Sequence, residues 1–157
     1  MKHQAIITEL RSTTGLFASF ILIALLGVSS IGVAQVDTWT QRADMPTARA
    51  TLGTAVVNGQ IYAIGGWTQI PMQVYFSTVE VYDPATDTWM QRADMPTARS
   101  GLSPVAVDGK IYAIGGFDGQ PLSTVGVYDP ATDTWETKTD MPTARGLYSI
   151  GVVNGKI

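Results

Sequence analysis

The chain has 157 residues, a formal net charge of −3, 15% charged residues and no cysteine. This length accommodates one domain, and the low charge content argues against a disordered polyampholyte. The acidic balance argues against a nucleic-acid partner, because phosphate binding needs clustered lysines and arginines. Without cysteine there are no disulfides or thiolate sites, and His3 is the only histidine. We therefore expect no metal, no cofactor and no catalytic residue.

The N-terminal 34 residues have the pattern of a secretory signal peptide. Lys2 and Arg11 precede an apolar run over 16–28, and small residues follow up to Ala34. The sequence predicts cleavage after Ala34 and an extracytoplasmic location, secreted or periplasmic, for the rest of the chain. The alternative is an uncleaved anchor, because 15–34 is long enough to cross a bilayer as a helix and would be the only membrane contact.

The remaining residues, 35–157, consist of internal repeats. Four motifs recur in the same order: Asp-Thr-Trp, Asp-Met-Pro-Thr-Ala-Arg, Ile-Tyr-Ala-Ile-Gly-Gly and Val-Tyr-Asp-Pro-Ala-Thr. Their tryptophans, arginines, glycine pairs and tyrosines are Trp39, Trp89, Trp135, Arg49, Arg99, Arg145, Gly65, Gly66, Gly115, Gly116, Tyr82 and Tyr128. Self-similarity at a fixed period is the signature of a repeat architecture. The only segment whose length varies follows the double glycine.

Each repeat is predicted to form four short antiparallel strands, and no helical periodicity follows Ala34. The strands show β-branched or alternating apolar patterns, and in the first copy they cover 51–57, 60–64, 78–82 and 88–92. Asn58-Gly59 supplies the two positive-φ positions of a type I′ hairpin turn. Pro104 falls in the first strand of the second copy, which predicts that this strand lies at a sheet edge, where a missing N–H is tolerated.

The order of double glycine, tyrosine and tryptophan makes 36–157 resemble kelch repeats. The resemblance implies an all-β fold, a kelch-type β-propeller built from four-stranded antiparallel blades. It implies a lone outer strand and crossing over 36–49, a first blade over 50–92, a second over 93–138 and a truncated third over 139–157. The tryptophans are expected to pack between blades.

The repeats number about two and a half, whereas closed propellers use roughly four to eight blades. We therefore expect an incomplete ring that is part of a longer protein. The alternative is a ring assembled from several copies of the chain.

Strand alternation places the loop after the double glycine and the Asp-Met-Pro-Thr-Ala-Arg crossing at one end of each blade, named here the long-loop face. Variable loops on a rigid scaffold commonly carry recognition. The candidate ligand-binding residues on this face are Arg49, Trp67, Gln69, Tyr75, Arg99, Phe117, Asp118 and Arg145. Aromatic rings stack on sugars and arginines bind carboxylates, so the expected ligand is a protein or a glycan.

Each of these candidates has a structural alternative. The arginines recur in identical contexts, which suits hydrogen bonds to loop carbonyls. Tyr75 is equally consistent with the start of the third strand, and Trp67 and Phe117 with packing beside the double glycines. The aspartates of the Asp-Pro-Ala-Thr-Asp segment are expected to cap turns, because their spacing lacks the alternating oxygen ligands of a calcium loop.

We expect an exported binding or interaction module rather than an enzyme. The resemblance also includes copper oxidases, which need two histidines and a tyrosine linked to a cysteine, but 35–157 contains neither histidine nor cysteine. An alternative is part of a sugar-processing enzyme such as an N-acetylneuraminate (sialic acid) epimerase, whose acidic substrate the arginines would hold. A gene fragment without its own function is the third interpretation.

Overall fold

The computed structural model describes residues 39–69 and 71–157, and within them it contains ten β-strands and no helix. Contacts divide the chain into Met1–Trp39 and Thr40–Ile157, and the fold described here is that of the second unit. The predicted signal peptide over 1–34 lies outside the described residues. In the described ranges, no helix is long and apolar enough to cross a membrane.

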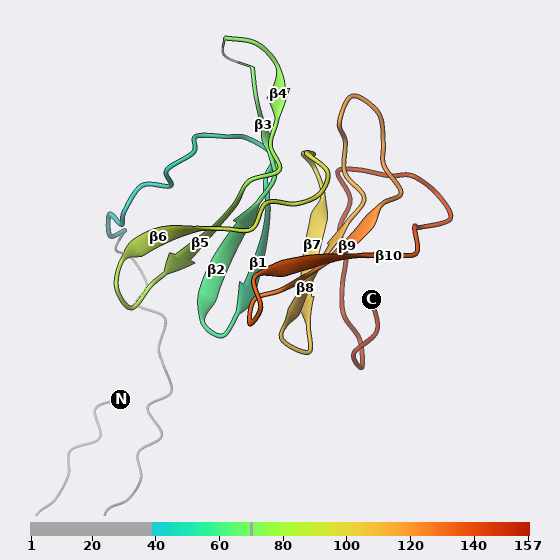
Figure 1. Ribbon diagram of the computed structural model, residues 1–157. Coiled ribbons are helices and arrows are strands. Elements are labelled where there is room, and N and C mark those ends of the chain that lie inside the picture. Colours follow the sequence, from blue (N-terminus) through green and yellow to red (C-terminus); the bar gives the residue numbers. More distant parts are fainter. Residues whose placement is uncertain (1–38, 70) are drawn as a thin grey trace, which may run out of the picture. The chain divides into compact units, whose positions relative to one another are not determined.

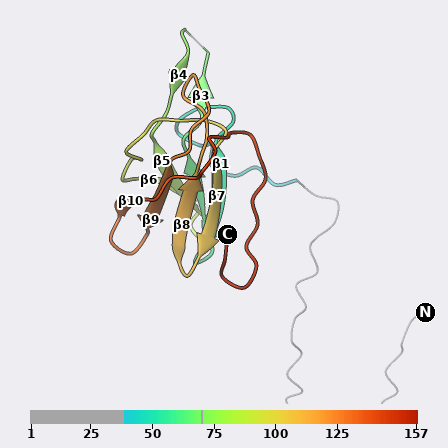
Figure 2. The same ribbon diagram turned by 90° about the vertical axis from the view of Figure 1, so that its right-hand side faces the viewer.

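Eight of the ten strands form two four-stranded antiparallel sheets. The first sheet has the order β1–β2–β5–β6, with β1 (Gly53–Val57), β2 (Gln60–Ile64), β5 (Val79–Asp83) and β6 (Thr88–Arg92). The second has the order β10–β9–β8–β7, with β7 (Ser103–Val107), β8 (Lys110–Ile114), β9 (Val125–Asp129) and β10 (Thr134–Lys138). The sheets lie side by side, with β1 against β7 (Figures 1 and 2). The prediction of four antiparallel strands per repeat is confirmed.

The hairpin turns adopt the conformation that the sequence predicts. Asn58 and Gly59 have φ values of 51° and 77°, and Asp108 and Gly109 have 49° and 75°. Two successive positive φ angles define the type I′ turn, whose twist matches that of the flanking strands. The turn therefore fixes the register, in which Val57 pairs with Gln60 and Gly53 with Ile64.

The innermost strands β1 and β7 each form the edge of their sheet. Pro104 lies in β7 opposite Ala113, so the prediction of an edge strand at this proline is confirmed. A Cβ placed on Gly53 in β1 would lie 2.4 Å from ring carbons of Pro104. The absence of a side chain at Gly53 thus lets the two inner strands approach each other closely.

The hydrophobic core lies between the two sheets. Val79 and Val81 of the first sheet and Ile111 and Tyr128 of the second have no exposed surface. The rings of Tyr62 and Tyr128 meet across this interface with centroids 5.9 Å apart. Each fully buried apolar side chain of this size contributes about 1.5–3 kcal/mol, so packing of one blade on the next is the main source of stability.

A polar cluster at the outer part of each sheet explains the recurring Tyr, Asp and Trp. Tyr128 donates its hydroxyl hydrogen to Asp133 at 2.6 Å, and its ring lies 5.2 Å from that of Trp135. Ala93 donates its N–H to Asp133 at 2.8 Å and accepts from Trp135 Nε1 at 2.9 Å. The same contacts recur in the first sheet among Tyr82, Asp87, Trp89 and Ala43. The motif residues therefore attach the crossing segment to the blade.

Trp39 belongs to the first of the two units, so its packing between blades stays a prediction. Its side chain is fully exposed. Trp89 and Trp135, in contrast, each pack on a tyrosine of the preceding strand.

The segment after the first double glycine is more ordered than a simple loop. It contains the short antiparallel strands β3 (Trp67–Thr68) and β4 (Val74–Tyr75). Tyr75 therefore belongs to this hairpin, and the interpretation of Tyr75 as the start of the third strand is wrong, because β5 begins at Val79. Figure 1 shows the hairpin extending beyond the two sheets, at the end opposite the Asn58-Gly59 turn.

Candidate functional site

The long-loop face contains three equivalent backbone positions, Thr51, Gly101 and Leu147, each two residues after a motif arginine. All three are left-handed, with φ values of 50°, 56° and 56°. The Gly101 N–H donates to the Thr51 carbonyl, and the Leu147 N–H donates to the Gly101 carbonyl, both at 2.8 Å. A side chain makes this conformation costly, so the ladder of hydrogen bonds holds Thr51 and Leu147 in it.

A pocket of about 300 Å³ lies beside this ladder and is named here the aromatic pocket. Its lining residues come from both blades and the C-terminal segment, and they are Thr51, Trp67, Gln73, Tyr75, Ser100, Phe117 and Leu147. Tyr75 and Phe117 meet edge to face, with ring centroids 6.2 Å apart. Three of the predicted ligand-binding residues, Trp67, Tyr75 and Phe117, are thus brought together.

Backbone pairing sets the positions of these aromatic side chains. Ala50 and Trp67 exchange two hydrogen bonds at 2.9 Å, and Ser100 and Phe117 exchange two at 2.9 and 2.8 Å. Gly66, just before Trp67, has a φ of 107°, and a Cβ on it would lie 2.9 Å from the Ala50 carbonyl oxygen. The double glycine therefore allows the residue just after it, Trp67, to pair with Ala50 at the end of the crossing segment.

The arginines of the first two repeats point into the protein. Arg49 donates to the Ala63 carbonyl at 3.0 Å and forms an ion pair of 3.0 Å with Glu80. Arg99 donates to the Ala113 carbonyl at 3.1 Å and is 3% exposed. Burial lowers the pKa of both arginines, and the charge of Glu80 opposes this effect at Arg49. These contacts favour a structural role, although the accepting carbonyls belong to the strands β2 and β8 and not to loops as the structural alternative expects.

The other predicted ligand-binding residues lie outside the aromatic pocket. Arg145 is exposed, while its backbone carbonyl accepts from Gly116. Gln69 is exposed and lines a second pocket of about 310 Å³, on which Arg49 and Trp67 also border. Asp118 is exposed, and its carboxylate accepts from the Gln120 N–H at 3.4 Å.

Sequence reasoning missed four residues of the aromatic pocket, Thr51, Gln73, Ser100 and Leu147. A signal for Thr51 and Leu147 is present, because the equivalent position in the second repeat is Gly101, which is compatible with a left-handed conformation. Gln73 lies in the longer of the two segments after the double glycine. The sequence gives no signal for Ser100, because its place in the pocket depends on backbone pairing with Phe117, which lies in a distant segment.

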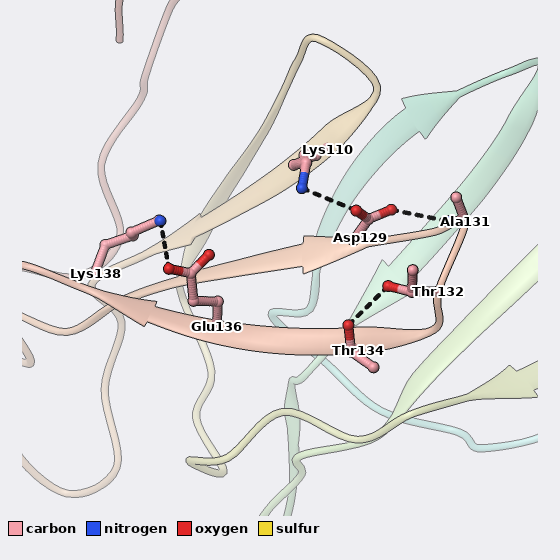
Figure 3. A network of polar contacts seen from close by, with 7 residues as sticks. All are labelled: Lys110, Asp129, Ala131, Thr132, Thr134, Glu136 and Lys138. Carbon is pink, nitrogen blue, oxygen red and sulfur yellow. Dashed lines mark hydrogen bonds and ion pairs between the residues drawn. The ribbon is translucent and has the colours of Figure 1, made fainter.

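The opposite end of the blades carries charged turns. Asp129 pairs with Lys110 at 2.8 Å and caps its turn by accepting from the Ala131 N–H at 2.9 Å (Figure 3). These two bonds lower the pKa of Asp129, and the pairing raises that of Lys110. Lys138 and Glu136 pair at 2.6 Å on β10, away from this turn. The predicted turn-capping role of this aspartate is confirmed, and Asp83 caps its turn in the same way.

In the part of the chain that the structure describes, no three histidine, cysteine, aspartate or glutamate side chains are grouped so that they could hold a metal ion. The aromatic pocket offers aromatic rings, two hydroxyls and one amide around a concave surface.

Comparison with known proteins places this geometry in context. The sequence model of the Kelch motif matches residues 48–96 and 98–142. A search of curated proteins finds no match. The chain is similar to a solved structure described as "Structure of YjhT", with 20% sequence identity over 69% of this chain and a TM-score of 0.61.

This similarity supports the fold, and the chain spans 42% of the length of that structure. The two matched motifs coincide with the two four-stranded sheets, which are kelch-type propeller blades. Because the motif covers more than half of the residues, the chain belongs to the kelch-motif family.

Proposed function

We propose that the protein is an interaction module that binds a partner protein through the long-loop face. The observation that carries this proposal is the aromatic pocket, in which Trp67, Tyr75 and Phe117 surround a volume of about 300 Å³. Kelch repeats generally mediate protein interactions. Aromatic side chains are enriched where proteins bind one another, because they bury a large area at a low cost in conformational entropy.

The polar groups of the pocket fit a peptide ligand. Thr51 and Ser100 supply hydroxyls and Gln73 an amide beside the rings, whereas Arg49 and Arg99 are engaged inside the blades. We therefore infer that the pocket takes an uncharged, apolar side chain of the partner. Hydroxyl and amide groups then pair with the partner's backbone.

A peptide-display selection on the full chain tests this proposal. Selected peptides should contain an aromatic or large aliphatic anchor, and Trp67→Ala or Phe117→Ala should weaken their binding by at least tenfold, since such anchors dominate interfaces. Lys138→Ala, an exposed site at a distance from the pocket, is the matched control. Enrichment of peptides that bind both pocket variants as well as the parent chain would contradict the proposal.

A neutral glycan is the second candidate. It is favoured by the combination of the aromatic rings with the Gln73 amide, which donates to the Tyr75 hydroxyl. A glycan array with the same variants distinguishes the two ligands, because Trp67→Ala should abolish a sugar signal that depends on stacking. The enzyme alternative stays a prediction.

We also propose that residues 1–34 direct the protein out of the cytoplasm, on the basis of their basic, apolar and small-residue order. Mass spectrometry of the product from secreting cells should find Gln35 at the N-terminus. A product that retains Met1 in the membrane fraction would favour the anchor over 15–34, and one in the cytoplasm would contradict export.

A further inference from the structure

In the first blade, a buried carboxylate is held by two residues of the crossing segment. Glu80 on β5 accepts a hydrogen bond from the Thr47 hydroxyl at 2.7 Å and pairs with Arg49 at 3.0 Å. The Arg49 side chain has no exposed surface and that of Glu80 is 5% exposed. Arg49 also donates to the Ala63 carbonyl of β2. Threonine, arginine and strand carbonyl thus form a site that is filled by the blade's own glutamate.

The second blade repeats this arrangement without the carboxylate. Thr97, Arg99 and Ala113 are equivalent to Thr47, Arg49 and Ala63, but Gly126 occupies the position of Glu80. Arg99 keeps its bond to the Ala113 carbonyl and turns its second nitrogen to the Thr124 hydroxyl. Among the described residues, no carboxylate forms an ion pair with Arg99.

A small pocket is present where the glutamate side chain would lie. It has a volume of about 40 Å³ and is lined by Thr97, Arg99, Gly126 and four neighbours, of which Pro96 and Thr137 are exposed. A Cβ on Gly126 would lie 3.6 Å from Arg99 Nη2. Since a single water needs roughly 10–15 Å³, this space admits a group of about three heavy atoms, and the exposed residues give access from solvent.

Electrostatics favours an anion in this pocket. A buried cation without a counter-charge is costly, and its partner must supply both charge and hydrogen bonds. Asp140 and Tyr148 are the titratable groups that act on Arg99 over a distance, as Asp94 acts on Arg49. Arg99 therefore lacks the direct contact with a carboxylate that Glu80 provides to Arg49 in the first blade.

We propose that Arg99 and Thr97 form a binding site for the carboxylate group of a small monocarboxylate, which takes the place of the glutamate side chain of the first blade. All residues that line this site belong to the second blade, and none of them lines the aromatic pocket. The volume restricts the ligand to a carboxylate with little or no attached body, such as formate or acetate. Its occupation neutralises Arg99 and stabilises the folded second blade.

Thermal unfolding of the full chain in formate tests the proposal. Sodium formate replaces sodium methanesulfonate at constant ionic strength, because methanesulfonate is too large for the pocket. We expect the melting temperature to rise by about 4 °C when formate reaches roughly ten times its dissociation constant. Carbon-13 formate should show line broadening with the protein and lose it on addition of acetate.

The matched variant is Gly126→Glu, which places the first blade's carboxylate in the second. A Cβ there would lie 3.2 Å from ring atoms of Trp135, so that ring must move slightly. This variant should be more stable than the parent chain and insensitive to formate. Thr97→Val keeps Arg99 and should lose most of the formate response, even if Gly126→Glu fails to fold.

The reverse variant, Glu80→Gly, should create a second site and show a larger formate response than the parent chain. An equal formate response in the parent chain, Gly126→Glu and Thr97→Val would overturn the proposal, as would no response in the parent chain. An equal response to chloride would overturn the assignment to carboxylates.

Discussion

The two blades share one framework and differ at one end. The two blades have the same strand order and the same register between their first two strands. The φ values of their hairpin turns agree to within a few degrees. They differ in the segment after the double glycine, where only the first blade has the β3–β4 hairpin, and at the position of Glu80 and Gly126. The repeated residues therefore set the framework, and the two differences create the aromatic pocket and the pocket at Arg99.

The largest difference between the blades should appear at the buried ion pair. Glu80→Gln leaves Arg49 buried without a counter-charge and should lower the free energy of unfolding by about 3–5 kcal/mol. Urea unfolding followed by tryptophan fluorescence measures this. Glu136→Gln on β10 is the matched control, because its pair with Lys138 is exposed and should matter little. Equal effects of the two substitutions would show that Glu80 does not neutralise Arg49.

The double glycines should behave alike in both blades, which tests the shared framework. A Cβ on Gly65 would lie 2.4 Å from the Arg99 carbonyl oxygen, and one on Gly115 would lie 2.3 Å from that of Arg145. We expect Gly65→Ala and Gly115→Ala each to cost about 3 kcal/mol in urea unfolding, since backbone atoms must move in addition to the left-handed strain. Gly59→Ala has the same sign of φ but open space, and should cost about 1 kcal/mol.

How far the sequence predicts this molecule depends on whether a feature is local. Asn58-Gly59 and the alternating strands specify their own conformation, so the hairpin turn and the four sheet strands of the first copy were predicted to within two residues, whereas β3 and β4 were not predicted. The aromatic pocket brings Trp67 and Tyr75 together with Phe117. Strand alternation predicts only that these three residues lie on the long-loop face, and not that they line one pocket. Pairing of Ser100 with Phe117 and the burial of Arg49 on Glu80 depend on contacts between distant segments, which no local pattern encodes.

A smaller difference is expected at the tyrosine–aspartate bond of each blade. Tyr128 is fully buried and donates to Asp133 at 2.6 Å. Tyr128→Phe should therefore lower the free energy of unfolding by about 1.5 kcal/mol, as for a hydrogen bond to a charged group. Tyr82→Phe removes the equivalent bond at a more accessible site and should have a smaller effect. A larger loss in Tyr82→Phe would contradict the ranking of the two blades by burial.

The same bond gives a pH dependence of defined sign. The pKa of Asp133 is lowered from 3.8 by the Tyr128 hydroxyl and then by the Ala93 N–H. A lowered folded-state pKa adds stability that is complete above the unfolded value and is lost as the pH falls through the folded one. The difference in free energy of unfolding between the parent chain and Tyr128→Phe, measured by urea unfolding, should thus be constant near pH 7 and become smaller below about pH 4. A gap that widens in acid would contradict this origin.

The smallest effect concerns the contact between the inner strands, where Gly53 of β1 lies against Pro104 of β7. Pro104→Ala should cost only about 0.5–1 kcal/mol, because an edge strand tolerates either residue and the loss arises from a freer unfolded chain. Gly53→Ala alone should cost more, since its Cβ would overlap the proline ring at 2.4 Å. In the double variant that overlap is relieved, so the two losses should fall short of additivity by about 1 kcal/mol in urea unfolding. Strict additivity would mean that β1 and β7 do not meet at this glycine.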